Sequence, residues 1–314
     1  MSIAVCLLLY SAAVVVFGPP LLSRLTSPGH APRLGVTVWV SAIASVLASW
    51  AAAAVLIVID VVRHWNSPIQ VLAACSVRLH EVVAGQAGIP AQLGILVIAT
   101  AAAGALGTLS MRLVKAFVHL RDTAHGHAQA VRIVGRHSAE RDVVVMDAAE
   151  PAAYCVAGRP TTIVLTTAAL NALDAQQLAA VVAHERAHLA GRHPQIVTAL
   201  RALATTLPRV RLITVGAVEV PKLLEMWADD AAAHRHGRTA LLSGLLDLAA
   251  TTPAPALGAA NVAVLSRAQR LLSPPAFPTQ TRTFAILTTA LLVIATGPLI
   301  TVALAATGTL NCMP

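Results

Sequence analysis

The chain has 314 residues, of which 57% are hydrophobic and only 11% carry a charge. A soluble globular domain carries about 25% charged residues, so the composition excludes a chain that is soluble along its whole length. The net charge of +8 does not indicate direct nucleic-acid binding, because 18 of the 22 basic residues share the stretch 112–282 with 12 of the 14 acidic residues and form no basic run.

Four apolar stretches are long enough to cross a membrane, which takes about 20 residues. They cover residues 3–22, 34–62, 91–111 and 283–307. The first has no basic n-region and no small-residue cleavage site, so it is predicted to be a retained helix and not a signal peptide.

The loops that follow the first and third apolar stretches carry the excess of Arg and Lys. This bias places both loops in the cytoplasm and both termini outside, in a multi-pass protein of the cell membrane. Residues 1–112 are thus predicted to hold three transmembrane helices with a short cytoplasmic loop and a longer external one, and residues 308–314 an external tail.

The segment 113–282 is the only one large enough to fold as a domain, and we expect it in the cytoplasm. Its early part contains β-rich runs at 142–146 and 161–165, and its later part is helical. The predicted fold class is a mainly α membrane protein of four transmembrane helices, with an α+β domain inserted between the third and fourth.

Helix signals in this segment begin with Asp174 and Gln177, which have the spacing of a capping box. The helix that they start is predicted to end near 191–194. Pro221 is suited to the first turn of a later helix. The further predicted helices cover 194–207, 221–237, 239–250 and 261–272.

The helix that follows Asp174 contains an HExxH motif, His184-Glu185-Arg186-Ala187-His188. Positions i and i+4 share a helix face, so both imidazoles can bind one ion. Glu185 lies about a third of a turn away, where it can act as general base toward the attacking water without binding the metal. The alternative is a helix surface with solvated His and Glu side chains.

A catalytic zinc site needs a third protein ligand that leaves one position open. Glu225 and Asp229 are again spaced i and i+4, in the sequence EMWADD. Glu225 can complete a site for one catalytic Zn²⁺ ion, while Asp229 can hold a ligand imidazole in one tautomer. Asp230 is a weaker candidate for that supporting role, and manganese or cobalt stays open as the metal.

The oxyanion of the transition state needs a donor besides the metal. Residues one to three turns past Glu225 are candidates, with solvated helix-end residues as the alternative reading: His234, Arg235, His236 and Arg238. His193 is interpreted as an exposed helix terminus. Residues 154–166 can offer an edge strand to an extended substrate, or they form an ordinary strand of the sheet.

The sequence AHERAHLAGRH, followed by EMWADDAA, resembles the BlaR/MecR-type membrane metallopeptidases, the antirepressor peptidases of β-lactam sensing. The prenyl-protein and HtpX-type peptidases share the wider HExxH…ExxxD plan. The resemblance implies a gluzincin-type domain with ligands His184, His188 and Glu225, the base Glu185 and the supporting Asp229. It also implies a cytosolic substrate, a winged-helix repressor of the BlaI type.

One departure from the BlaR/MecR pattern concerns the input signal. A penicillin-binding sensor domain and a Ser-x-x-Lys motif are both lacking, so no β-lactam acylation is expected. The external loop at 68–83 is a candidate receiver of another signal. Cys75 and Cys312 both fall on the predicted outer face, and we hypothesise a disulfide between them, with two separate small apolar residues as the alternative.

The sequence therefore predicts an integral-membrane zinc endopeptidase that cleaves a cytosolic regulatory protein in signal-dependent gene regulation. One alternative is a membrane quality-control protease of the HtpX type. The other is a non-catalytic membrane scaffold or receptor that keeps the fold without turnover.

Overall fold

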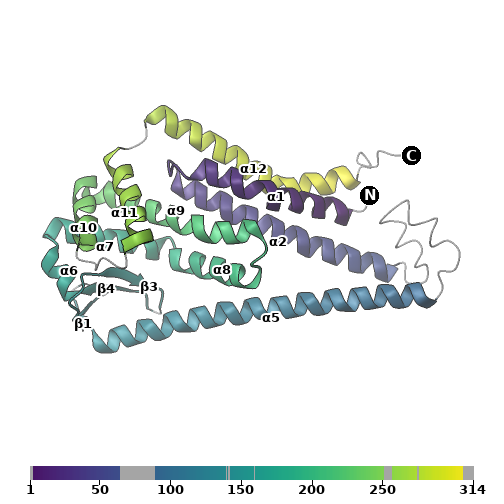
Figure 1. Ribbon diagram of the computed structural model, residues 1–314, viewed down its shortest axis with the longest axis horizontal. Coiled ribbons are helices and arrows are strands. Elements are labelled where there is room, and N and C mark those ends of the chain that lie inside the picture. The colour runs from purple at the N-terminus through teal and green to yellow at the C-terminus, as the bar shows by residue number, and fades with distance from the viewer. Residues whose placement is uncertain are drawn as a thin grey trace.

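The computed structural model describes residues 3–63, 89–138, 140, 142–158, 160–250, 257–273 and 276–306. Three of its helices, α1 (Ile3–Thr26), α2 (Pro32–Arg63) and α12 (Phe277–Ala306), are long and apolar enough to cross a membrane. They pack against one another at one end of the elongated molecule (Figure 1). These helices cover the predicted first, second and fourth spans and indicate a membrane protein.

The predicted third span lies inside α5 (Ile89–Val134). Most side chains of the first part of this helix lie outside the described residues, so the four-span topology stays a prediction. The helix continues without a break through His119 and His127, which makes it about 70 Å long. The loop at 68–83 and the Cys75–Cys312 pair also lie outside the described residues.

A four-stranded sheet follows α5, in the order β1-β2-β4-β3. Its strands are β1 (Arg136–His137), β2 (Val143–Met146), β3 (Ala153–Val156) and β4 (Thr162–Thr166). β2 and β4 pair in parallel, and the two outer pairs are antiparallel. β2 and β4 are the two β-rich runs of the sequence. Of the region proposed as an edge strand, β3 lies at the edge and β4 lies inside the sheet.

The helices after the sheet surround the motif-bearing segment. They are α6 (Thr167–Ala172), α7 (Ala175–Ala190), α8 (His193–Thr206), α9 (Arg211–His236), α10 (Arg238–Ala250) and α11 (Leu257–Leu272). The start of α7 has the predicted capping box: the Asp174 carboxylate accepts from the backbone of Gln176 and Gln177, and the Gln177 side chain accepts from the backbone N–H of Asp174. This cap fixes where the motif helix begins.

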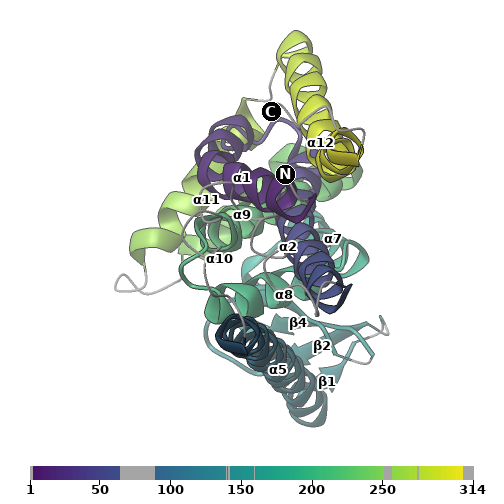
Figure 2. The same cartoon turned by 90° about the vertical axis from the view of Figure 1, so that its right-hand side faces the viewer.

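The sheet packs between α5 and α7 because its side chains alternate between the two faces. Val144 and Val164 face α5, where they pack with Val131. Ile163, the neighbour of Val164, faces the other way and packs with Val182 of α7. Figure 2 shows α5 on one side of the sheet and α7 on the other, while α8 packs directly against α5. The motif helix therefore rests on a buried sheet face.

Helix α9 begins ten residues earlier than the sequence predicts, at Arg211, so Pro221 lies inside the helix and not in its first turn. The β-branched run between these two residues has a weak intrinsic preference for helix. Its apolar side chains pack against the membrane helices, and this tertiary packing outweighs the local preference.

The first half of α9 is packed against α2 in one continuous hydrophobic core. Leu212 and Leu223 of α9 share this core with Trp39 and Ile43 of α2. The two helices approach closely at Gly216, where a Cβ atom would lie 3.0 Å from Ile43 and 3.3 Å from Trp39. The helix that carries Glu225 and Asp229 is therefore anchored at its other end to the membrane helices.

The substitution Gly216→Leu is expected to destabilise the protein by about 1–3 kcal/mol, because a leucine would overpack the contact between α2 and α9. The measurement is thermal unfolding of the full chain in detergent micelles. Gly107→Leu on α5 is the matched control, since a Cβ there meets no atom within 4 Å among the described residues. An equal apparent melting temperature for both variants would contradict the close approach.

Small residues bring α7, α9 and α10 close together. Ala180 and Ala183 of α7 pack with Ala232 of α9 and Leu241 of α10 in a second buried cluster. Alanine side chains allow helix axes to approach more closely than larger side chains do. This packing places the HExxH face of α7 opposite the acidic residues of α9.

Candidate metal centre

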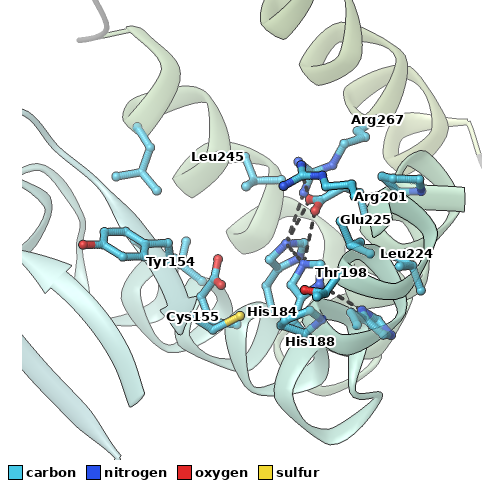
Figure 3. Close-up of a pocket in the computed structure, with 18 residues that line it drawn as sticks. Tyr154, Cys155, His184, His188, Thr198, Arg201, Leu224, Glu225, Leu245 and Arg267 are labelled. Atoms are coloured by element: carbon cyan, nitrogen blue, oxygen red, sulfur yellow. Dashed lines mark hydrogen bonds and ion pairs between the residues drawn. The ribbon is translucent and has the colours of Figure 1, made fainter. Parts of the chain in front are cut away.

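Two imidazoles and one carboxylate converge between α7 and α9. Nε2 of His184 lies 3.1 Å from Nε2 of His188. The two carboxylate oxygens of Glu225 lie 3.4 Å from Nε2 of His184 and 3.4 Å from Nε2 of His188. Figure 3 shows both rings pointing from α7 toward Glu225. The structure thus brings together the three ligands that the sequence predicts.

The separations of these donor atoms fit a small divalent ion. A tetrahedral ion with bonds of 2.0–2.1 Å to nitrogen and oxygen holds its ligands about 3.3–3.4 Å apart. The two contacts of Glu225 use different carboxylate oxygens, and one donor atom from each of the three residues lies within 4.8 Å of the other two. Two imidazole nitrogens and a carboxylate that converge in this way form a donor set that fits a divalent metal.

Asp229 contacts His184 at Nδ1, the ring nitrogen that does not face the other two ligands. One of its carboxylate oxygens lies 3.1 Å from Nδ1 of His184, and Asp229 is almost completely buried. Burial opposes charge on the imidazole, but contacts with Asp229 and Glu225 outweigh it and raise the pKa of His184 to about 9. Asp229 therefore occupies the predicted position for fixing the tautomer of a ligand histidine.

Arg267 of α11 neutralises the acidic groups of the site. Its guanidinium makes a two-pronged contact with Asp229, at 2.8 and 2.6 Å. It also lies 3.1 Å from Glu225 (Figure 3). Burial opposes ionisation of both carboxyls. The hydrogen bonds that each carboxyl makes, together with the charge of Arg267, outweigh this and hold both pKa values below their ordinary range. No motif in the sequence points to Arg267.

Glu185 faces the same cavity from the next position on α7. It is buried, and burial is the main cause that raises the pKa of its carboxyl. The neighbouring imidazoles act in the opposite direction. Glu185 is not one of the three converging donors. A carboxyl whose pKa is raised, beside but outside a metal site, has the properties of a general base.

The cavity at the site has a volume of about 500 Å³. One wall is the edge strand β3, which contributes Ala153, Tyr154 and Cys155. Burial raises the pKa of the Cys155 thiol, which keeps it protonated. The apolar part of the lining comes from Val181, Val197, Leu224, Leu245 and Leu248. The edge strand β3 and the residues of the metal centre thus line one cavity.

The four residues proposed as oxyanion donors do not reach the cavity. All are exposed at the end of α9 and the start of α10, and the cavity lining includes none of them: His234, Arg235, His236 and Arg238. His234 is nine residues from Glu225, about 14 Å along the helix axis, and α9 leads away from the site. The cations that do line the cavity are Arg267 and Arg201 of α8.

His193 is not the exposed helix terminus that the sequence suggests. Its relative exposure is 1%, and its Nδ1 lies 2.8 Å from Nδ1 of His188. Its ring packs against that of Trp227, with the centroids 4.6 Å apart. Burial lowers the pKa of His193 to about 4, so the ring is neutral at physiological pH.

The raised pKa of His184 gives a testable pH dependence. The pKa of folded His184, about 9, exceeds the ordinary histidine value of 6.5. This group therefore stabilises the metal-free protein most below pH 6.5, and that stabilisation is lost as the pH rises through 9. The proton must leave before Nε2 can bind a metal. We expect the affinity for Zn²⁺ to rise by up to about tenfold per pH unit below pH 9 and then to level off. Titrations against a chromogenic chelator measure this, and a flat profile over the range would contradict it.

Comparison with known proteins places this site within a recognised family domain. Residues 119–271 match peptidase family M48, which is just under half of the chain and includes all three converging ligands. No curated protein and no solved structure matches the chain. The family indicates a metallopeptidase, in agreement with the geometry of the site. Residues 119–271 of this chain are thus similar to the domain of peptidase family M48.

Proposed function

We propose that this chain is an integral-membrane zinc endopeptidase. The observation that carries the proposal is the convergence of His184, His188 and Glu225 beside the buried carboxyl of Glu185. Two imidazole nitrogens and one carboxylate are the donor types that favour Zn²⁺ over the larger or harder divalent ions. Three protein ligands leave one position for substrate and water.

When bound, the ion would polarise the scissile carbonyl and lower the pKa of the attacking water. The Glu185 carboxylate takes one proton from that water while the water oxygen forms a bond to the carbonyl carbon. Glu185 then gives this proton to the amide nitrogen as the carbon–nitrogen bond breaks, so that a free amine and a carboxylic acid leave. The raised pKa of Glu185 suits both transfers.

The substrate is proposed to bind as an added strand on β3. This strand pairs with β4 along one edge only, and its residues 153–155 line the cavity. The other edge is able to pair with an extended peptide through backbone hydrogen bonds. Binding through the backbone suits an enzyme that cuts within a chain, because it needs neither end of the substrate.

For the substrate we propose a cytosolic regulatory protein, a winged-helix transcriptional repressor of the BlaI type, whose cleavage would relieve repression in response to a signal. The support is the resemblance of AHERAHLAGRH and EMWADDAA to the antirepressor peptidases, together with the predicted cytoplasmic side of the domain. Quality control of damaged membrane proteins, as in the HtpX type, is the alternative enzymatic role. A scaffold or receptor without turnover is the non-enzymatic one.

Comparison of the cellular proteomes of the wild type and of a Glu185→Gln strain tests the proposed role. One repressor-derived fragment that is missing from the variant strain would support regulation. Loss of many unrelated membrane-protein fragments would support quality control and overturn the repressor proposal. Identical proteomes and phenotypes would favour the scaffold over any peptidase.

A further inference from the structure

The turn between α7 and α8 has an unusual backbone. Arg192 adopts a φ of 53°, and among the described residues it is the only one other than glycine with a positive φ. An ordinary residue in this left-handed conformation costs about 1–2 kcal/mol relative to glycine. Gly191 precedes it, and α8 begins directly after it at His193. Such a strained turn persists only where the surrounding structure gains from it.

The strained turn folds the first residue of α8 back onto the metal centre. His193 sits beneath His188, with the two Nδ1 atoms 2.8 Å apart. Gly191 is required for this, because a Cβ atom there would overlap the imidazole of His193. Trp227 of α9 packs on the ring of His193, and the guanidinium of Arg33 lies 5.0 Å over Trp227. The buried imidazole of His193 is thus held in place by three residues: Gly191, Arg192 and Trp227.

The direction of the hydrogen bond between the two histidines follows from their nitrogens. Nε2 of His188 faces the other two ligands and must carry a lone pair to bind a metal. The proton of neutral His188 is then on Nδ1, from which it is donated to Nδ1 of His193. His193 in turn keeps its proton on Nε2, an atom that is buried without a hydrogen-bond partner among the described residues. If His193 donated instead, the proton of His188 would move to Nε2 and block the metal.

We propose that His193 is a positioning residue, which holds His188 in the tautomer and the ring orientation that bind the metal. This inference rests on the proposed metal site. His184 has the carboxylate of Asp229 behind it, whereas His188 has an imidazole. The two ligands are therefore supported differently, and the second support adds no negative charge to a site that already holds Glu225, Asp229 and Glu185. Substitution of a residue that hydrogen-bonds to a metal-binding histidine typically lowers metal affinity by about 10–100-fold.

The experiment compares His193→Asn with His193→Leu in the full-length protein in lipid nanodiscs. The two side chains have nearly the same shape, but only asparagine offers an acceptor atom at the position of Nδ1. We expect His193→Leu to weaken Zn²⁺ binding about 10–100-fold and His193→Asn to bind close to wild type. The readout is competition with a chromogenic chelator, without any substrate.

Thermal unfolding of the metal-free variants separates positioning from a structural role. His193→Leu removes the unpartnered Nε2 from a buried place but also leaves Nδ1 of His188 without its partner, so the two effects oppose each other and the metal-free form should unfold close to the temperature of the wild type. Lower metal affinity without lower stability would support positioning. Equal Zn²⁺ affinity for both variants, or an affinity loss that follows a loss of stability, would overturn it. Wild-type protein that binds no Zn²⁺ would instead refute the metal site itself.

Discussion

Substitution of Glu185 by glutamine is expected to lower kcat/KM for peptide hydrolysis by about 10²–10⁴-fold, the usual contribution of a general base. Glutamine has the same size and keeps an oxygen and a nitrogen in place of the two carboxylate oxygens, but it cannot accept the proton of the attacking water. The fold should be unaffected, because glutamine also removes the need to bury a carboxyl whose charged form is already disfavoured by burial.

The measurement combines two assays on the purified full-length chain, peptide cleavage and Zn²⁺ content. The variant should retain its ion, since Glu185 is outside the set of converging donors. Glu219→Gln is the matched control: Glu219 lies on α9 and pairs with Lys222 on the surface, and an exposed pair of this kind contributes little. If Glu185→Gln kept full activity, Glu185 would not be the base. If it lost the ion, its role would be in metal binding.

The second large effect is expected for Glu225→Ala. Residues that only support a metal ligand contribute about 10–100-fold to metal affinity, and the loss of Glu225 should reduce Zn²⁺ affinity by more than this. The alanine leaves two imidazoles as the only protein ligands, and it also removes one of the two carboxylates that hold Arg267. Peptidase activity should fall below detection at Zn²⁺ concentrations that saturate the wild type. Metal analysis after dialysis gives the direct readout.

Asp229→Asn gives a graded comparison, because asparagine keeps a polar atom near His184 but loses the charge. We expect its Zn²⁺ affinity to lie between those of the wild type and Glu225→Ala. The reverse order, with Asp229→Asn the weaker binder, would mean that Glu225 is not a ligand. Glu219→Ala should bind as the wild type does, since it pairs with Lys222 away from the site.

The parts of the site that depend on local periodicity were predictable from the sequence. The i, i+4 spacing places His184 and His188 on one helix face wherever the helix lies, and the capping box at Asp174 indicates where this helix begins. Glu225 could be chosen because a site with two histidines needs a third ligand and few acidic residues follow. The structure brings these side chains together.

The parts of the site that depend on tertiary packing were not predictable. His193 follows Gly191 and Arg192, a sequence typical of an exposed helix end, and only the left-handed backbone of Arg192 turns it inward. Arg267 is 38 residues from Asp229 in the sequence, with no motif connecting them. The basic end of α9 shows the opposite case. His234 and its neighbours are close to Glu225 in the sequence, but α9 leads away from the cavity, and none of them lines it.

The early start of α9 has a practical consequence for anyone who expresses the catalytic part alone. A fragment spanning 113–282 would lose α1 and α2 and leave the first half of α9 uncovered, including Leu212, Ile213, Val220, Leu223 and Leu224. Burial of each such side chain contributes about 1.5–3 kcal/mol, and five together approach the entire 5–15 kcal/mol that typically separates a folded domain from its unfolded chain. We expect such a fragment to aggregate, because α1 and α2 cover this half of α9 in the full-length chain.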